Sequence, residues 1–218
     1  MTAKHVSVVI PCRDEAGSIA AVVSRVPAGM ECIVVDNGSI DGTGEVAAAS
    51  GARVIDEPRP GYGAAVIAGI AASTADVICT VDGDGSLDPA ELPTLLAHLD
   101  KGADLVVGRR RPVSVRSWPV HARLGSLGTA WYLRHRHGLP VHDIGPVRVA
   151  ARSTLLELGR LDPESGYPVE LLVRAAERRL SVVECDVRYS PRTAGQSKVS
   201  GSLAGSYRAA RDFVAALS

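Results

Sequence analysis

Short apolar runs that alternate with helical patterns are the feature that most constrains the fold of this chain. The runs have strand length and are continuously apolar, without polar residues at every second position. Such runs are typical of parallel strands that are buried on both faces of a sheet. The pattern predicts strands over 6–11, 32–36, 53–56, 76–81, 105–108, 147–150 and 182–189, with helices near 16–26, 42–50 and 62–73. We therefore expect an α/β fold with a mostly parallel central sheet flanked by helices.

Polar, acidic and glycine residues gather directly after the predicted strands. In open α/β sheets, ligands bind at the carboxyl ends of the strands. The segments that follow the strands read CRDE (12–15), NGSIDG (37–42), EPRPGYG (57–63), DGDGS (82–86) and RRR (109–111). The sequence therefore predicts that the active site lies along this edge of the sheet.

The composition favours one globular domain over residues 1–218, since 46% of the residues are hydrophobic and the length suits a single α/β unit. No apolar run approaches the roughly 20 residues that cross a bilayer, and no basic and apolar leader begins the chain. We therefore expect a cytoplasmic protein without a transmembrane segment. The four cysteines stand singly in or beside apolar runs, which favours free thiols over a disulfide or a zinc site.

Charge is divided unequally between the two halves of the chain. Residues 1–108 hold 6 Lys and Arg against 15 Asp and Glu, whereas residues 109–218 hold 18 against 9. One interpretation is a first half that binds metal and nucleotide and a second half whose arginines face a phosphate-rich acceptor or a membrane. The other is that these arginines are solvated on helix surfaces.

The stretch TVDGDGSLDPAE, residues 80–91, resembles a calcium-binding loop of the EF-hand type. A buried strand is predicted before it, where an EF-hand needs a helix, and Thr80 offers no carboxylate at the first position. Asp88, followed by a proline and Glu91, is instead a sound helix start. A D-x-D pair also opens a phosphatase motif, but that motif needs a Thr or Val where Ser86 stands. Asp82 and Asp84 are therefore predicted to hold Mg²⁺ or Mn²⁺ against a nucleoside diphosphate.

Several segments in order carry a family resemblance. The chain resembles family 2 glycosyltransferases with the GT-A fold, and within them the dolichyl-phosphate mannose synthase-like branch. The resemblance extends from residue 6 to about residue 211 and rests on VSVVIPCRDEAGSI (6–19), CIVVDNGSIDGT (32–43), RPGYGAAVIAG (59–69), VDGDGSLDP (81–89), DLVVGRR (104–110), HDIGPVRVAARSTLLELG (142–159), GYPVELLVRAAERRLSVVECDVRY (166–189) and RTAGQSKVSG (192–201).

The resemblance implies a role for each matching residue. Asp82 and Asp84 would bind the metal, with Asp84 as its principal ligand. The family often has Asp where this chain has Asn37, and mannose synthases often have Gln where it has Ser86. The implied donor-binding residues are Pro11, Arg13, Glu15, Asp36, Asn37, Gly61, Gly63, Asp82, Arg192, Ser197 and Lys198, the last three on a loop that closes over the diphosphate. For Gly61 and Gly63, which open a predicted helix, the alternative is simple turn chemistry.

For the acceptor, the resemblance implies that Arg109, Arg110 and Arg123 grip the phosphate of a polyprenyl phosphate. A phosphate acceptor is already an anion and needs no strong general base. A hydroxyl acceptor does need one, and Asp143 or Glu170 would then supply it. Asp84, Asp143 and Glu170 are therefore the candidate catalytic residues.

We expect a metal-dependent, inverting glycosyltransferase that moves a sugar from a UDP- or GDP-sugar to a polyprenyl phosphate at the inner membrane face, without a nucleic-acid partner. The alternatives are a transferase with a soluble hydroxyl acceptor, a sugar nucleotidyltransferase and a non-catalytic binding module. A nucleotidyltransferase usually has a glycine-rich loop with Lys after the first strand, which CRDEAGS lacks. The amphipathic carboxyl-terminal segment is expected to be a helix that packs on the domain or lies on a membrane surface.

Overall fold

A single sheet organises the molecule. The structure, a computed structural model, describes residues 4–114 and 117–193. Within these residues seven strands form one sheet in the order β3-β2-β1-β4-β6-β5-β7. The strands are β1 (Val6–Cys12), β2 (Glu31–Asp36), β3 (Arg53–Asp56), β4 (Val77–Thr80), β5 (Leu105–Pro112), β6 (Arg148–Ala151) and β7 (Val182–Tyr189). The sheet joins both halves of the chain, because β4 from the first half pairs with β6 from the second.

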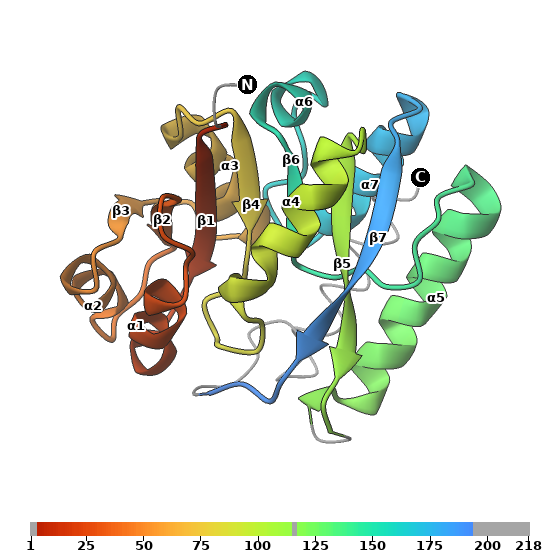
Figure 1. Ribbon diagram of the computed structural model, residues 1–218. Coiled ribbons are helices and arrows are strands. Elements are labelled where there is room, and N and C mark those ends of the chain that lie inside the picture. The colour runs from red at the N-terminus through yellow and green to blue at the C-terminus, as the bar shows by residue number, and fades with distance from the viewer. Residues whose placement is uncertain (1–3, 115–116, 194–218) are drawn as a thin grey trace.

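Six of the seven strands run in the same direction. The pairs β1–β2, β1–β4, β2–β3 and β5–β7 are parallel. β6 is antiparallel to both of its neighbours, β4 and β5, so those two strands also share one direction. The carboxyl ends of all the strands except β6 therefore lie along one edge, which is the lower edge in Figure 1. This arrangement confirms the predicted mostly parallel sheet and its active edge.

Helices cover both faces of the sheet. They are α1 (Ala16–Ser24), α2 (Thr43–Ala49), α3 (Tyr62–Ala72), α4 (Leu92–Asp100), α5 (Val120–His137), α6 (Arg152–Glu157) and α7 (Tyr167–Glu177), with a short 3-10 helix over Pro89–Glu91. Alternate residues of each strand face opposite sides, so two separate hydrophobic clusters form. In β1, for example, Val9 packs toward α3 and α7, whereas Val8 and Ile10 pack toward α1 and α4.

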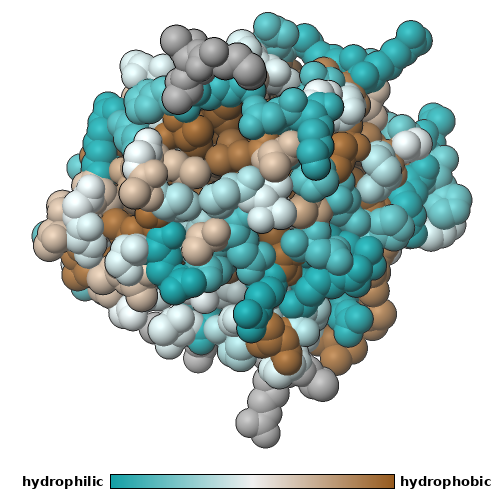
Figure 2. All heavy atoms as spheres, viewed as in Figure 1, coloured by the Kyte–Doolittle hydropathy of each residue, from teal (hydrophilic) through white to brown (hydrophobic). Residues whose placement is uncertain are grey.

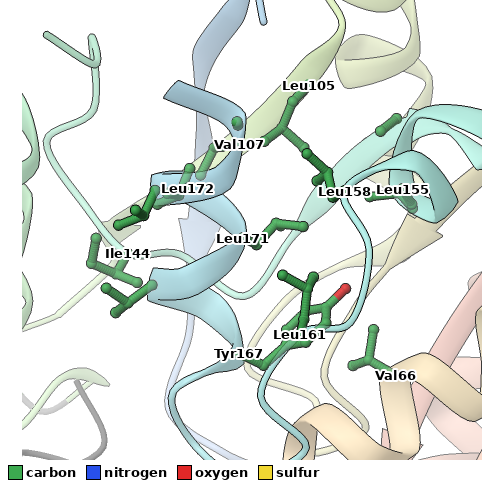
Figure 3. Close-up of a cluster of buried hydrophobic side chains, with 14 of the residues drawn as sticks. Val66, Leu105, Val107, Ile144, Leu155, Leu158, Leu161, Tyr167, Leu171 and Leu172 are labelled. Carbon is green, nitrogen blue, oxygen red and sulfur yellow. The ribbon is translucent and has the colours of Figure 1, made fainter. Parts of the chain in front are cut away.

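The cluster beneath α7 shows how the second half of the chain is held to the sheet. Leu171 and Leu172 of α7 are fully buried and belong to the same cluster as Leu105 and Val107 of β5 (Figure 3). Burying a leucine side chain stabilises a fold by about 1.5–3 kcal/mol relative to leaving it exposed. The helices thus hold the sheet rigid while the loops at its edge remain available for chemistry.

Two features differ from the expectation. β5 was expected to end at Gly108 with RRR in the following loop, but it continues to Pro112 because it pairs with β7 as far as Tyr189. The three arginines therefore lie within a strand. β6 runs antiparallel, which apolar residues alone could not reveal, since a buried strand has the same composition in either direction. Among the described residues, no helix is both long and apolar enough to cross a membrane.

Candidate active site at the carboxyl edge of the sheet

The D-x-D loop, residues 82–86, follows β4 and lies against the loop that follows β1. Gly83 is the point of closest approach: a Cβ atom there would lie 2.3 Å from the Cys12 Sγ atom and 2.5 Å from Glu15 Oε2. The Ser18 hydroxyl in α1 donates a hydrogen bond of 2.8 Å to the Gly83 carbonyl. Any larger residue at this position would have to displace the Cys12 or Glu15 side chain, so glycine allows the carboxylates of Glu15, Asp82 and Asp84 to share one region.

These three carboxylates, which we call the acid cluster, repel one another. Burial, followed by the charges of Asp84 and Asp82, raises the pKa of Glu15 to about 8. Burial and the charge of Asp84 likewise raise the pKa of Asp82 to about 7. Glu15 Oε2 is buried and makes no hydrogen bond among the described residues. Full ionisation of all three carboxylates would place more negative charge here than the surroundings neutralise, so the cluster favours a bound proton or a bound cation.

Arg192 supplies the one direct counter-charge that the described residues place on the cluster. Its Nη2 atom lies 2.9 Å from Asp84 Oδ2, and the Asp84 side chain is 2% exposed. The backbone follows the same course, because Thr193 N–H donates to the Asp84 carbonyl at 3.1 Å and Ser190 N–H donates to the Ser86 carbonyl at 2.9 Å. The segment after β7 is thereby bound along the D-x-D loop.

A divalent cation suits the chemistry of the acid cluster, although the side chains do not form a finished cage. In the described part of the chain, no three His, Cys, Asp or Glu side chains are placed to share one ion. Mg²⁺ and Mn²⁺ are commonly held by one or two carboxylates together with substrate phosphates, so Asp82 and Asp84 are enough to begin such a site. The unpartnered Glu15 oxygen and the mutual repulsion of the ionised carboxylates favour cation binding here.

The loops after β1 and β2 are joined by hydrogen bonds. Glu15 N–H donates to Thr43 Oγ1 at 2.8 Å, and Asp14 N–H donates to Ser39 Oγ at 3.0 Å. Asp36, at the end of β2, accepts the Ser39 N–H at 2.8 Å. Of the expected donor-binding residues, Pro11 is buried in β1, Asp36 is half-buried and Arg13 is exposed. The structure thus brings these three residues to the edge that also carries the D-x-D loop.

Asn37 has a structural role that the sequence did not indicate. Its Nδ2 atom donates to the carbonyls of Glu57 and Arg59 at 2.9 and 2.8 Å, and its Oδ1 atom accepts the Gly61 N–H at 2.9 Å. Asn37 as a whole residue is 8% exposed. Its side-chain amide holds the loop after β3 in place. Both polar atoms of the Asn37 side chain are therefore occupied by backbone groups, which disfavours a contact with the sugar-nucleotide donor.

The loop before α7 packs against the amino end of α3, where Gly61 and Gly63 were expected either to help bind the donor or to serve a turn. Gly63 N–H donates to the Glu164 carbonyl at 3.1 Å, and Ala64 N–H donates to the Pro163 carbonyl at 2.7 Å. A Cβ atom at Gly61 would lie 2.2 Å from the Pro163 carbonyl oxygen, and one at Gly63 would lie 2.1 Å from that of Asp162. These glycines therefore admit the loop before α7, whose carbonyls accept the Gly63 and Ala64 N–H groups that an anion would otherwise use.

Arg110 and Asp143 form a buried ion pair next to the site. Arg110 Nη2 lies 2.7 Å from Asp143 Oδ1, and the two side chains are 14% and 3% exposed. Asp143 also accepts the Arg110 Nε–H at 2.8 Å and the Ser126 hydroxyl at 2.6 Å. Burial alone would raise the pKa of Asp143, but the hydrogen bonds and charge of Arg110 hold it below its usual value. These contacts are unfavourable for a general base and commit the Nε and Nη2 atoms of Arg110 to Asp143 and Ser126.

The other acceptor and base candidates lie in different surroundings. Arg109 is 30% exposed and lies 3.8 Å from Glu184, while Arg123 is exposed on α5. Glu170 accepts the Asp162 N–H at 2.6 Å and pairs with Arg174 at 3.2 Å, so it orders the start of α7 and makes no contact with the acid cluster. Ser197 and Lys198 lie outside the described residues.

Sequence reasoning missed three groups that build this region. The Arg110 guanidinium stacks 3.8 Å from the centre of the Trp118 ring, and Trp118 in turn meets Tyr189 edge-on at 5.7 Å. Glu184, in the middle of β7, accepts the Asp143 N–H at 3.0 Å. A charged residue among the apolar residues of a strand is a usable signal, because a side chain as little exposed as that of Glu184, at 9%, is seldom without partners. The aromatic residues carried no such signal.

The amino-acid sequence is similar to those of known glycosyltransferases. The family model for glycosyl transferase family 2 matches residues 7–149. An uncharacterized glycosyltransferase of Mycobacterium tuberculosis is 57% identical over 213 residues, with 98% of each chain covered. A polyprenol monophosphomannose synthase of Mycolicibacterium smegmatis is 36% identical, with 89% of this chain and 81% of the relative covered.

Solved structures support the architecture. A glucosyl-3-phosphoglycerate synthase of Mycobacterium tuberculosis, crystallised with Mn²⁺, UDP-glucose and glycerol 3-phosphate, superposes with a TM-score of 0.79 at 25% identity. The match covers 98% of this chain and 79% of that one. The expected GT-A fold is confirmed by this likeness.

Proposed function

Because the chain belongs to glycosyltransferase family 2, we propose that it transfers a hexose from a UDP- or GDP-sugar to a polyprenyl phosphate, with inversion at the anomeric carbon. The observation that carries this proposal is the acid cluster at the carboxyl edge of the sheet. Its raised pKa values and its unpartnered Glu15 oxygen suit a bound cation and, through it, a diphosphate. The proposal thus joins a confirmed enzyme class to a specific donor and acceptor.

For the donor, Asp82 and Asp84 are proposed to hold Mg²⁺ or Mn²⁺. A cation bound there would neutralise charge on the nucleoside diphosphate as the glycosidic bond breaks. Asp36, at the end of β2, can accept hydrogen bonds from the base or the ribose. Arg192 is close enough to turn from Asp84 to the diphosphate, as a guanidinium binds phosphate as well as carboxylate.

For the acceptor, the contacts of the two candidate bases favour an anion over a hydroxyl group. Asp143 is committed to Arg110, and Glu170 is committed to the start of α7. Neither side chain is free to accept a proton from an attacking hydroxyl group, whereas a phosphate oxygen needs no such help. Arg109 and Arg123 remain partly or fully exposed and can bind the phosphate. The mannose synthase relative, named for polyprenol monophosphate, is consistent with this choice.

A soluble acceptor is the second candidate. The structural neighbour is named for glucosyl-3-phosphoglycerate and was crystallised with glycerol 3-phosphate, a small phosphorylated alcohol. In transfer to such an acceptor, a hydroxyl group would attack the sugar. Asp143 or Glu170 would then have to leave its present contacts to act as the general base. The two candidates therefore differ in whether transfer needs a titrating carboxylate.

The test is a transfer assay with Mn²⁺, a panel of UDP- and GDP-sugars, and three acceptors: a polyprenyl phosphate, the matching unphosphorylated polyprenol, and phosphoglyceric acid. We expect product only with the polyprenyl phosphate, detected by mass spectrometry. Transfer to phosphoglyceric acid alone would establish the soluble alternative. Thermal shift with UDP and GDP, each with and without Mn²⁺, tests donor binding separately, and the absence of stabilisation by both would refute the donor assignment.

Asp84→Asn is expected to abolish Mn²⁺-dependent stabilisation by the nucleotide. Asp88→Asn is the matched control, because it removes the same charge from the same stretch of chain, where Asp88 pairs with Arg25 on the surface. We expect Asp88→Asn to retain the Mn²⁺-dependent shift. Equal effects of the two substitutions would show that net charge, and not the acid cluster, governs binding.

A further inference from the structure

One face of α5 exposes a row of large hydrophobic side chains. Val120, Leu124, Leu127 and Trp131 are 66%, 63%, 41% and 55% exposed. Their spacing of four, three and four residues places them on the same side of an α-helix. We call this row the α5 outer face. The opposite side of the helix is buried through Ser126, Ala130 and Leu133, so the outer face is a surface that the described fold leaves uncovered.

The outer face lies on the lower right margin of the molecule. Figure 1 shows α5 starting beside the carboxyl end of β5 and running back along the outside of the fold. Figure 2, in the same view, shows hydrophobic side chains gathered in that region. Among residues 4–114 and 117–193, the remaining large exposed hydrophobic residues are Ile40, Val113 and Leu156, and Val113 lies in the segment that leads from β5 into α5. Within this part of the chain, most of the exposed large hydrophobic side chains therefore lie on α5.

The charged residues of α5 and of the segments that flank it in the chain are all basic. Residues 105–142 contain no Asp or Glu but seven Arg and four His. Arg123 and Arg134, eleven residues apart, share a helical row on one flank of the outer face, and His121 and His135 lie on the other flank. A hydrophobic row with tryptophan and leucine, flanked by arginine, is the pattern of a helix that lies in a membrane interface.

The inner side of α5 is attached to the proposed acceptor region. The Ser126 hydroxyl donates to Asp143 at 2.6 Å and accepts from Arg110 Nη2 at 3.2 Å. Arg110 belongs to β5, next to the partly exposed Arg109. A surface that held the outer face of α5 would therefore lie beside the arginines at the edge of the sheet.

We propose that the α5 outer face docks on an anionic lipid bilayer, with Leu124 and Trp131 at the acyl boundary and the flanking arginines among the phosphate headgroups. The inference rests on the proposed function, since a polyprenyl phosphate is presented at a membrane. Charge complementarity decides the occupant. In a symmetric contact with a second copy, the acid-free surfaces of two α5 helices would face each other, and like charges would oppose that contact.

The first test uses the whole protein and vesicles. We expect cosedimentation with vesicles of phosphatidylglycerol and phosphatidylcholine, weakening as salt is raised, and much weaker binding to phosphatidylcholine alone. Brominated lipids should quench Trp131, while Trp118, which is 7% exposed, should keep its emission. No binding to anionic vesicles at low salt would overturn the proposal.

Leu124→Gln combined with Leu127→Gln tests the face itself. We expect the partition coefficient to fall by about ten-fold or more, since each leucine loses the free energy of burial in the interface. Leu156→Gln, on α6, removes an equally exposed leucine elsewhere and should bind vesicles normally. Equal binding by the double variant and the wild type would overturn the proposal. A wild-type dimer that the double variant dissociates, without vesicle binding, would assign the face to a second copy instead.

A transfer assay separates this inference from the proposed function. The double variant should transfer sugar to a short, water-soluble polyprenyl phosphate at the wild-type rate but act more slowly on the same acceptor embedded in vesicles. Its nucleotide-dependent thermal shift should match that of the wild type. If the wild type binds vesicles but transfers to neither acceptor, the proposed function fails while the membrane-docking face stands. Equal slowing on both acceptors would overturn the docking role.

Discussion

Arg192 Nη2 and Asp84 Oδ2 lie 2.9 Å apart, so an arginine from beyond the last strand neutralises the aspartate on which cation binding is proposed to depend. The pair joins β7 to the loop after β4, and the Thr193 N–H bond to the Asp84 carbonyl reinforces it. A cation that binds Asp84 Oδ2 competes with this guanidinium for the same oxygen. Binding of the cation and release of the 190–193 segment are therefore expected to be coupled.

Replacing Arg192 should make this competition visible. In the absence of nucleotide, Arg192→Gln is expected to bind Mn²⁺ more tightly by on the order of ten-fold, because no charged hydrogen bond of about 1.5 kcal/mol has to be broken. Free Mn²⁺, followed by electron paramagnetic resonance, measures this directly. Arg174→Gln, which removes a surface arginine paired with Glu170, is the control and should leave the affinity unchanged. Weaker Mn²⁺ binding by Arg192→Gln would contradict the competition.

Gly83 is expected to be sensitive to an added side chain. Gly83→Ala places a methyl group 2.3 Å from Cys12 Sγ and 2.5 Å from Glu15 Oε2, so these buried side chains or the D-x-D loop must move to relieve the overlap. We expect a loss of about 1–3 kcal/mol in the free energy of unfolding, measured by urea denaturation. Gly125→Ala is the matched control, since it is exposed on α5 with no atom within 4 Å, and it should be neutral or stabilise by up to about 1 kcal/mol. Equal stability of the two variants would show that the loops are not in close contact.

The Arg110–Asp143 pair should contribute to stability at neutral pH. Asp143→Asn leaves the buried Arg110 charge without its partner and is expected to cost about 3–5 kcal/mol. The pKa of Asp143 is lowered in the fold, so the stabilisation is fully present above the ordinary aspartate pKa and is lost as pH falls through the lower folded value. The difference between wild type and variant should therefore stay constant from pH 8 to pH 5 and shrink below about pH 4. A difference that instead shrank between pH 6 and pH 8 would contradict this assignment.

Asn37 should be sensitive even to an isosteric change. Asn37→Asp replaces the amide that donates to the Glu57 and Arg59 carbonyls with a carboxylate that repels them. We expect a loss of about 2–4 kcal/mol at pH 7, because two buried acceptors lose their donor beside a new charge. Thermal and chemical denaturation measure this effect. Asn37→Asp with wild-type stability would return this residue to the donor-binding role implied by the resemblance.

The elements and the active edge could be predicted because their signals are local. The range predicted for β3, 53–56, and that for β7, 182–189, agree with the structure, and the other strands shifted by only one or two residues at most ends. Hydrophobic runs and the turn residues that end them lie within a few positions of each other, so they can be read without knowing the fold. The end of β5 was predicted wrongly, because its last four residues form a strand only through pairing with β7.

The site was predicted in outline and corrected in its contacts. Asp82, Asp84, Glu15 and Asp36 were expected at one edge, and the structure places them there. Gly61 and Gly63 were expected either to help bind the donor or to serve a turn, and the loop before α7, about 100 residues further along the chain, packs against that helix end. Close packing explains why both positions are glycine.

By itself, the amino-acid sequence determined the succession of strands and helices, the edge where the chemistry gathers and, through its ordered motifs, the enzyme family. Only the tertiary structure decided which charges neutralise one another: Arg192 with Asp84, Arg110 with Asp143, and Glu184 with the backbone before β6. Secondary structure follows from residues that are neighbours in the chain. The partner of a buried charge is set by which distant segments the hydrophobic core brings together, and no local pattern records that choice.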